Sequence, residues 1–115
     1  MAVQFNATAL LQEYGDEQLV RDLAQLLVET TPGQLDAVRA ALVAGDGEAL
    51  RAAAHKLKGS LASFDVPEAV EWAHTLESIV TTGAGLSQVT SVYESLAVVV
   101  GTLVESGREW LALQS

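Results

Sequence analysis

Apolar residues along this chain recur three and four positions apart, the spacing that places side chains on one side of an α-helix. One such series consists of Leu19, Leu23, Leu26 and Leu27. A second series lies further along, at Leu50, Ala53, Leu57, Leu61 and Phe64. No segment alternates apolar and polar residues for long enough to predict a strand, and only two prolines occur. The pattern predicts an all-α protein.

Capping residues and glycines mark the first helices. Asn6 is a suitable N-cap for a short helix that runs to Tyr14 and stops at Gly15. Asp16 can cap the next helix. Pro32 interrupts that second pattern, and it leaves open whether the segment is one long kinked helix or two helices.

Three further helices are expected, and short turns separate them. Their expected ranges are about 48–64, 67–82 and 87–113. Helices joined by short connections tend to pack as antiparallel neighbours. We therefore expect an up-down antiparallel four-helix bundle with a short extra N-terminal helix.

The chain has 115 residues, and we expect one domain that spans residues 1–115. It has no cysteine, which excludes disulfide bonds and thiolate metal sites and fits a reducing compartment. The N-terminus lacks the features of a signal peptide. The longest apolar run near the C-terminus, 96–100, is far shorter than the ~20 residues that span a bilayer. We expect a cytoplasmic protein without membrane contact.

Acidic residues dominate the charge, which is −9 overall with 15 acidic and 6 basic side chains. Nucleic acid is excluded as a partner, because its phosphates demand Lys and Arg clustered over a broad surface. Three of the six basic residues nevertheless lie within 51–58 around His55, and no Asp or Glu occurs from 49 to 64. This pattern suggests a site that accepts, holds and passes on an anionic group.

On a helix, His55 points away from the apolar series, and its surface neighbours are the residues three and four positions away. These neighbours are Arg51, Ala52, Lys58 and Gly59. The two cations can stabilise negative charge carried by the ring, and the two small residues leave room for an approaching protein. A glycine inside a helix costs about 1 kcal/mol relative to alanine, and close approach of a partner would explain it. The alternative is an ordinary solvated histidine.

Other chemistries find little support. Glu71 and His74 have the Glu-x-x-His spacing of di-iron bundles, but no second such motif occurs. Two histidines without cysteine do not make a zinc site, so we expect no metal on this chain. No phosphate-binding loop motif is present, so we expect no autokinase activity from ATP.

The segment around His55 resembles the signature of histidine-containing phosphotransfer (HPt) domains of bacterial multistep phosphorelays. The matching residues are Ala53-Ala54 followed by His55-Lys56-Leu57-Lys58-Gly59-Ser60. The resemblance covers nearly the whole chain, including the later helix with Leu76-Glu77. The family often has glycine ten residues after the histidine, where this chain has Asp65. We expect this difference to alter the turn and not the chemistry.

The resemblance implies a role for each residue of the segment. His55 would be the phosphoacceptor through Nε2, Lys58 would lie near the phosphoryl oxygens, and Gly59 would permit docking. The remaining members of the expected phosphate- and partner-binding site are Arg51, Ala52, Lys56 and Ser60.

Glu77 is expected beside the histidine. The turn between their helices centres near Val66, eleven residues from each, so antiparallel packing brings Glu77 level with His55. The family commonly has an amide or carboxylate here that accepts a hydrogen bond from the Nδ1–H group of the ring, which leaves Nε2 free to attack. The alternative is that Glu77 is an ordinary carboxylate at the rim of its helix.

Our main hypothesis is a freestanding phosphocarrier, not an enzyme, without a cofactor of its own. Its partners would be receiver domains of a hybrid histidine kinase, of a response regulator, or of both. Mg²⁺ would belong to the partner receiver. Two alternatives stay open: the phosphoacceptor domain of a larger hybrid or chemotaxis kinase, and a helical adaptor that binds a receiver without carrying phosphate.

Overall fold

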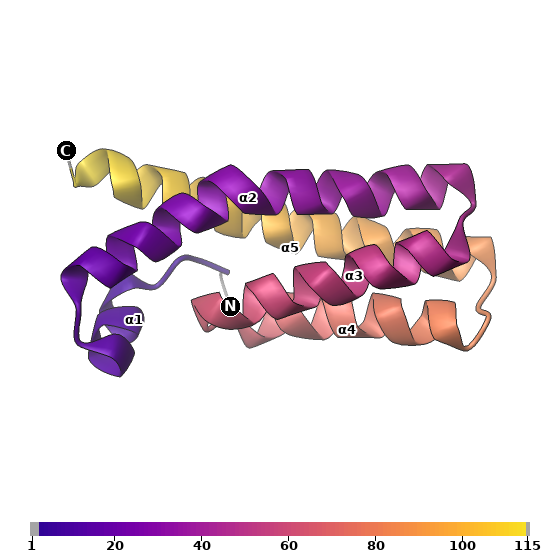
Figure 1. Ribbon diagram of the computed structural model, residues 1–115, viewed down its shortest axis with the longest axis horizontal. Coiled ribbons are helices and arrows are strands. Elements are labelled where there is room, and N and C mark those ends of the chain that lie inside the picture. Colours follow the sequence, from indigo (N-terminus) through magenta and orange to yellow (C-terminus); the bar gives the residue numbers. More distant parts are fainter. Residues whose placement is uncertain (1–2, 115) are drawn as a thin grey trace.

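The computed structural model describes residues 3–114 and is helical, with no strand among those residues. Its long helices are α2 (Glu17–Ala44), α3 (Gly47–Leu61), α4 (Pro67–Thr81) and α5 (Leu86–Leu113). A short helix, α1 (Ala7–Tyr14), precedes them, and a 3₁₀ turn, η1 (Ala62–Phe64), follows α3. The described chain measures 44 × 22 × 21 Å along its principal axes. Figure 1 shows the long helices lying lengthwise, with successive helices joined at alternate ends. The predicted all-α class is confirmed.

Local capping explains the first two helices. The side chain of Asn6 accepts a hydrogen bond from the backbone N–H of Ala9, and Gly15 ends α1 at φ 69°. Asp16 caps α2, which then runs without a break through Pro32 to Ala44. The sequence did not decide whether this segment forms one helix or two, and the structure has one helix. Packing along α3 and α5 offsets the roughly 3 kcal/mol that an interior proline costs.

The core lies between the four long helices, because α2 and α4 each pack against both α3 and α5. Its fully buried leucines are Leu10, Leu27, Leu57, Leu61, Leu76, Leu96 and Leu103. On α3 the line of core contact passes through Ala54, which is fully buried, whereas the predicted Ala53 is only partly buried at its edge. Residues 50, 54, 57 and 61 are four, three and four apart, which keeps them in line along one face.

Asp65 closes the connection between η1 and α4. Its backbone lies in the left-handed region, at φ 55° and ψ 46°, and it is the only non-glycine residue with positive φ in the described chain. Glycine adopts this conformation most easily, and aspartate tolerates it better than most residues. An aspartate therefore occupies a turn position whose backbone geometry suits glycine.

Helix α5 is long and apolar enough to cross a membrane by length and composition alone. The sequence-based expectation considered only the uninterrupted run 96–100 and did not detect this. Core helices of soluble proteins meet the same criterion, and α5 buries one face against α2 and α4. This single helix is weak evidence for a membrane span.

Two glycines of α5 should respond oppositely to alanine substitution. A Cβ at Gly107 would lie 2.9 Å from Cδ2 of the buried Leu27, whereas one at Gly101 would meet nothing within 4 Å. Gly101→Ala should raise the free energy of unfolding by about 0.5–1 kcal/mol through helix propensity. Gly107→Ala gains the same term but overpacks the core by about 1–3 kcal/mol, so it should lower stability by about 1 kcal/mol. Urea unfolding of both variants measures the difference, and equal stabilisation would refute close α2–α5 packing here.

Candidate functional site

His55 lies on the outer side of α3, and its side chain is 65% exposed. Its Nδ1 atom is hydrogen-bonded across to α4, 2.6 Å from Oε2 of Glu77. Its Nε2 atom makes no hydrogen bond to residues 3–114. Because a carboxylate only accepts, Nδ1 carries a proton, and in the neutral imidazole the free lone pair is therefore on Nε2. His55 therefore presents a nucleophilic nitrogen to solvent.

Glu77 links His55 to Lys58. Its Oε2 faces the imidazole, while its Oε1 accepts a hydrogen bond of 2.7 Å from Nζ of Lys58. The Glu77 side chain is only 15% exposed, so both partners bond a carboxylate that has lost much of its water. The structure thus brings together three residues that the sequence singled out, from two helices.

The ammonium group of Lys58, which bonds the carboxylate, holds the pKa of Glu77 below its ordinary value of 4.5. Burial opposes this shift, and the hydrogen bond with His55 adds to the lowering. Because the pKa is lower in the folded chain than in the unfolded chain, the charged carboxylate stabilises the fold fully above pH 4.5. That contribution is lost as the pH falls below 4.5 and through the folded-state pKa.

The ammonium group of Lys58 is engaged in an ion pair with Glu77. The resemblance placed this side chain near the oxygens of a phosphoryl group, and here its ammonium bonds Glu77, with the side chain 25% exposed. The charge of a largely buried carboxylate is stabilised by such a partner, which explains the arrangement. In this structure Lys58 holds the carboxylate that orients His55.

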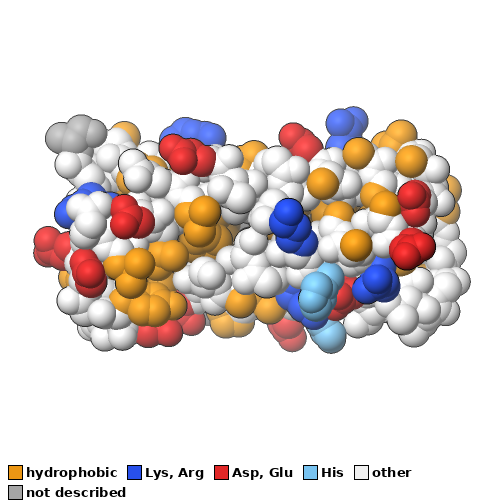
Figure 2. All heavy atoms as spheres, in the orientation of Figure 1, with side chains coloured by type: hydrophobic (Ala, Val, Ile, Leu, Met, Phe, Trp, Pro, Cys, Tyr) orange, Lys and Arg blue, Asp and Glu red, His pale blue; other side chains and the backbone are white. Residues whose placement is uncertain are grey.

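The other predicted site residues surround His55 on α3. Arg51, Ala52, Lys56 and Gly59 are exposed, and Ser60 is half-buried. A Cβ added to Gly59 would meet nothing within 4 Å, so packing inside the described chain does not require glycine there. In Figure 2 the pale-blue histidine side chains lie next to blue side chains of lysine or arginine and to red acidic ones.

His74 is a neighbour of the site that the sequence reasoning missed. Its Nδ1 lies 4.0 Å from Oε1 of Glu77, too far for a hydrogen bond, and its side chain is 62% exposed. The sequence pattern had suggested a role for His74 only as a metal ligand together with Glu71. Its spacing of three residues from Glu77 on one helix was the available signal.

Comparison with known proteins agrees with this geometry. A protein-family model described as "Hpt domain" matches residues 22–106, a range that contains α3, α4 and every residue of the candidate site. No curated protein and no solved structure matches the chain.

Proposed function

The chain belongs to the Hpt domain family, whose members carry phosphoryl groups in phosphorelays and bind receiver domains, and we propose that His55 is its phosphoacceptor. The protein would take a phosphoryl group from the aspartate of one receiver domain and give it to the aspartate of another. The observation that carries this proposal is the state of the imidazole, which is exposed, bonded through Nδ1 to Glu77 and open at Nε2.

The transfer needs little covalent chemistry from the protein. The Nε2 lone pair attacks phosphorus in line, the P–O bond to the aspartyl carboxylate breaks, and the receiver aspartate leaves as a free carboxylate. The ring becomes positively charged as the P–N bond forms. Glu77, bonded at Nδ1, stabilises that charge and keeps the ring oriented. The return step onto a second receiver reverses the same bond changes.

Cations on α3 would stabilise the transferring group. Arg51 and Lys56 are exposed near His55 and form no ion pair among residues 3–114, so both can meet a negatively charged partner. Lys58 would approach the phosphoryl oxygens from its place beside Glu77, and Ala52 and Ser60 would border the contact. Mg²⁺ would come with the receiver, and we propose no cofactor on this chain.

The wider proposal is a phosphocarrier without enzymatic activity of its own, built as one domain with antiparallel up-down helices and located in the cytoplasm. The alternation of helix ends in Figure 1 supports this topology. A carrier of this kind acts either as a freestanding protein or as the phosphoacceptor domain of a larger kinase.

Incubation with a phosphorylated receiver domain tests the proposal. Wild-type protein should acquire a label that is labile in acid and stable in alkali, as expected for phosphohistidine, and should pass it to a second receiver. If the receiver binds and no label appears, the chain is an adaptor and the phosphocarrier proposal is wrong.

Substitution of Gly59 should separate docking from stability. Gly59→Ala should raise the free energy of unfolding by about 0.5–1 kcal/mol, because the added methyl group meets open space in a helix. Gly59→Gln adds a longer side chain to the proposed contact, so receiver binding should weaken by about tenfold. Calorimetric titration with the receiver measures the effect, and Gly101→Ala, with equal free space on α5, is the control. Unchanged binding by Gly59→Gln would exclude this residue from the interface.

A further inference from the structure

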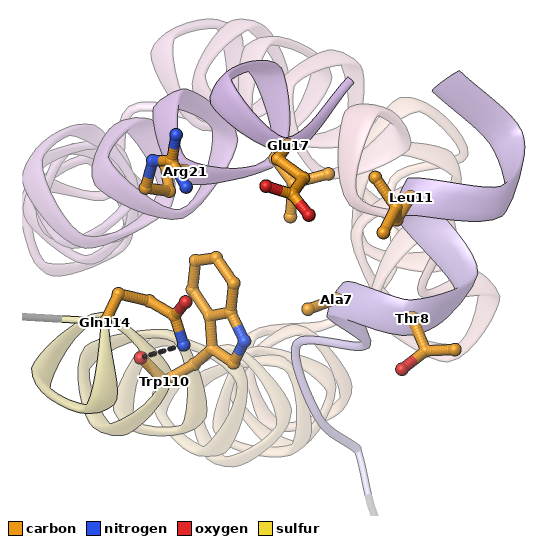
Figure 3. A pocket seen from close by; sticks show the side chains of 8 residues that line it. Ala7, Thr8, Leu11, Glu17, Arg21, Trp110 and Gln114 are labelled. Atoms are coloured by element: carbon orange, nitrogen blue, oxygen red, sulfur yellow. Dashed lines mark hydrogen bonds between the residues drawn. The ribbon is translucent and has the colours of Figure 1, made fainter. Parts of the chain in front are cut away.

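A pocket of about 230 Å³ lies between α1, α2 and α5, and none of its lining residues comes from α3 or α4. It is lined by Ala7, Thr8, Leu11, Glu17, Val20, Arg21, Trp110 and Gln114. Figure 3 shows the indole of Trp110 on one side, Ala7 and Leu11 on another, and the charged ends of Glu17 and Arg21 above the indole.

Two contacts with Phe5 and its backbone hold the indole of Trp110 in place. The ring of Phe5 packs against Trp110 with centroids 5.3 Å apart, and Phe5 itself is buried. The backbone N–H of Phe5 also donates a hydrogen bond to Oγ of Ser106, one turn before Trp110 on α5. The apolar wall is therefore a fixed feature of the fold.

The two charged side chains of the pocket do not neutralise each other. Glu17 and Arg21 are four residues apart on α2, a spacing that favours an ion pair, yet within residues 3–114 the carboxylate of Glu17 has no ion-pair or hydrogen-bond partner. Arg21 donates instead to the neutral amide of Gln18, at 3.0 Å. A free anion and a guanidinium with spare donors thus border one pocket, beside the apolar side chains of its other wall.

We propose that this pocket binds a small zwitterion with an apolar body, of the class of α-amino acids with aliphatic side chains. The ligand ammonium would meet the carboxylate of Glu17 and the face of the Trp110 indole, which attracts cations. The ligand carboxylate would bond the guanidinium of Arg21. The aliphatic side chain would lie against Leu11 and Val20, away from water.

The volume limits the ligand to the size of a single amino acid. Drug-sized ligands fill pockets of roughly 300–1,000 Å³, and this one is smaller. A ligand of about nine non-hydrogen atoms, such as L-leucine, should bind with a Kd on the order of 1 mM. The site lies apart from His55, so binding does not depend on phosphotransfer.

Titration of the ¹⁵N-labelled full chain with L-leucine, followed by NMR, tests the proposal. The indole N–H signal of Trp110 should shift in a saturable manner, while that of Trp72, on α4 and outside the pocket, should stay in place. N-acetyl-leucine and leucinamide, which lack the ammonium and the carboxylate respectively, should each bind about tenfold more weakly.

Substitutions of Glu17 and Arg21 test which charged group of the ligand each residue binds. Glu17→Gln should remove the preference for leucine over N-acetyl-leucine and keep the preference over leucinamide, and Arg21→Gln should do the reverse. Glu29→Gln and Arg39→Gln, also on α2 but outside the pocket, are matched controls that should bind as wild type does. Circular dichroism confirms that each variant is folded. A Trp110 signal that does not saturate, or equal shifts with all three ligands on wild-type protein, would overturn the proposal.

Discussion

His55→Gln should abolish acceptance of a phosphoryl group from a phosphorylated receiver domain. The variant removes the imidazole ring, and with it the nucleophilic nitrogen of the proposed step, and an amide nitrogen offers no comparable lone pair. Glutamine is a good helix former, and the side chain at this position is 65% exposed, so the fold should be retained. Transfer is measured as radiolabel that stays with the protein in alkali and is lost in acid, with the receiver in excess.

Substitution of the second histidine, His74, is the matched control for the loss of phosphoryl acceptance in His55→Gln. His74 is 62% exposed and lies 4.0 Å from the same carboxylate, yet within residues 3–114 its ring makes no hydrogen bond that would orient it. His74→Gln should therefore be labelled within a few-fold of the wild-type rate. If His55→Gln is labelled and His74→Gln is not, the phosphoacceptor has been assigned to the wrong helix.

Glu77→Ala should slow transfer by about 10–100-fold, the range seen when the carboxylate that orients a functional histidine is removed in metal sites. The substitution frees Nδ1, so the ring can rotate and the proton can move to Nε2, which blocks attack. It also releases Lys58 from its 2.7 Å bond with Oε1. Single-turnover transfer at saturating receiver measures the rate, and ¹⁵N NMR of the imidazole reports which nitrogen carries the proton.

Glu77→Gln separates orientation from charge. Its amide oxygen can still accept from Nδ1–H of His55, so the tautomer should be kept, but the ring loses its anionic partner. The rate should fall between those of wild type and Glu77→Ala. A wild-type rate in Glu77→Ala with an unchanged tautomer would show that Glu77 does not position the ring.

The helices could be predicted closely because their signals are local. Asn6, Asp16 and Gly15 act on backbone groups within one turn of themselves, so the bounds of α1 and the start of α2 follow from the order of residues. The continuity of α2 through Pro32 did not follow, since it depends on the helices packed along it. The shift of the core line from Ala53 to Ala54 has the same origin, because the rotation of α3 is set by its neighbours.

For the site, the spacing of residues on one helix was sufficient to place His55 outward, with Arg51, Lys56 and Gly59 exposed around it. The position of Glu77 along its helix, level with His55, followed from the equal number of residues that separates each of them from the turn between the two helices. Whether its side chain faces His55 depends on how α3 and α4 are oriented relative to each other. The interlocking of core side chains sets that orientation. For this reason the sequence left Glu77 open as an ordinary rim carboxylate, and did not anticipate that Lys58 and His74 approach the same oxygen.

The sequence by itself determined an all-α chain, its turns, and an outward histidine in a locally cationic segment, because each depends on residues a few positions apart. The tertiary structure alone decided the hydrogen bond from Nδ1–H of His55 to Glu77, the pairing of Lys58 with that carboxylate, and the pocket lined by Glu17, Arg21 and Trp110. These features join residues from different helices, and their distances follow from how whole helices pack, a quantity that no short stretch of sequence contains.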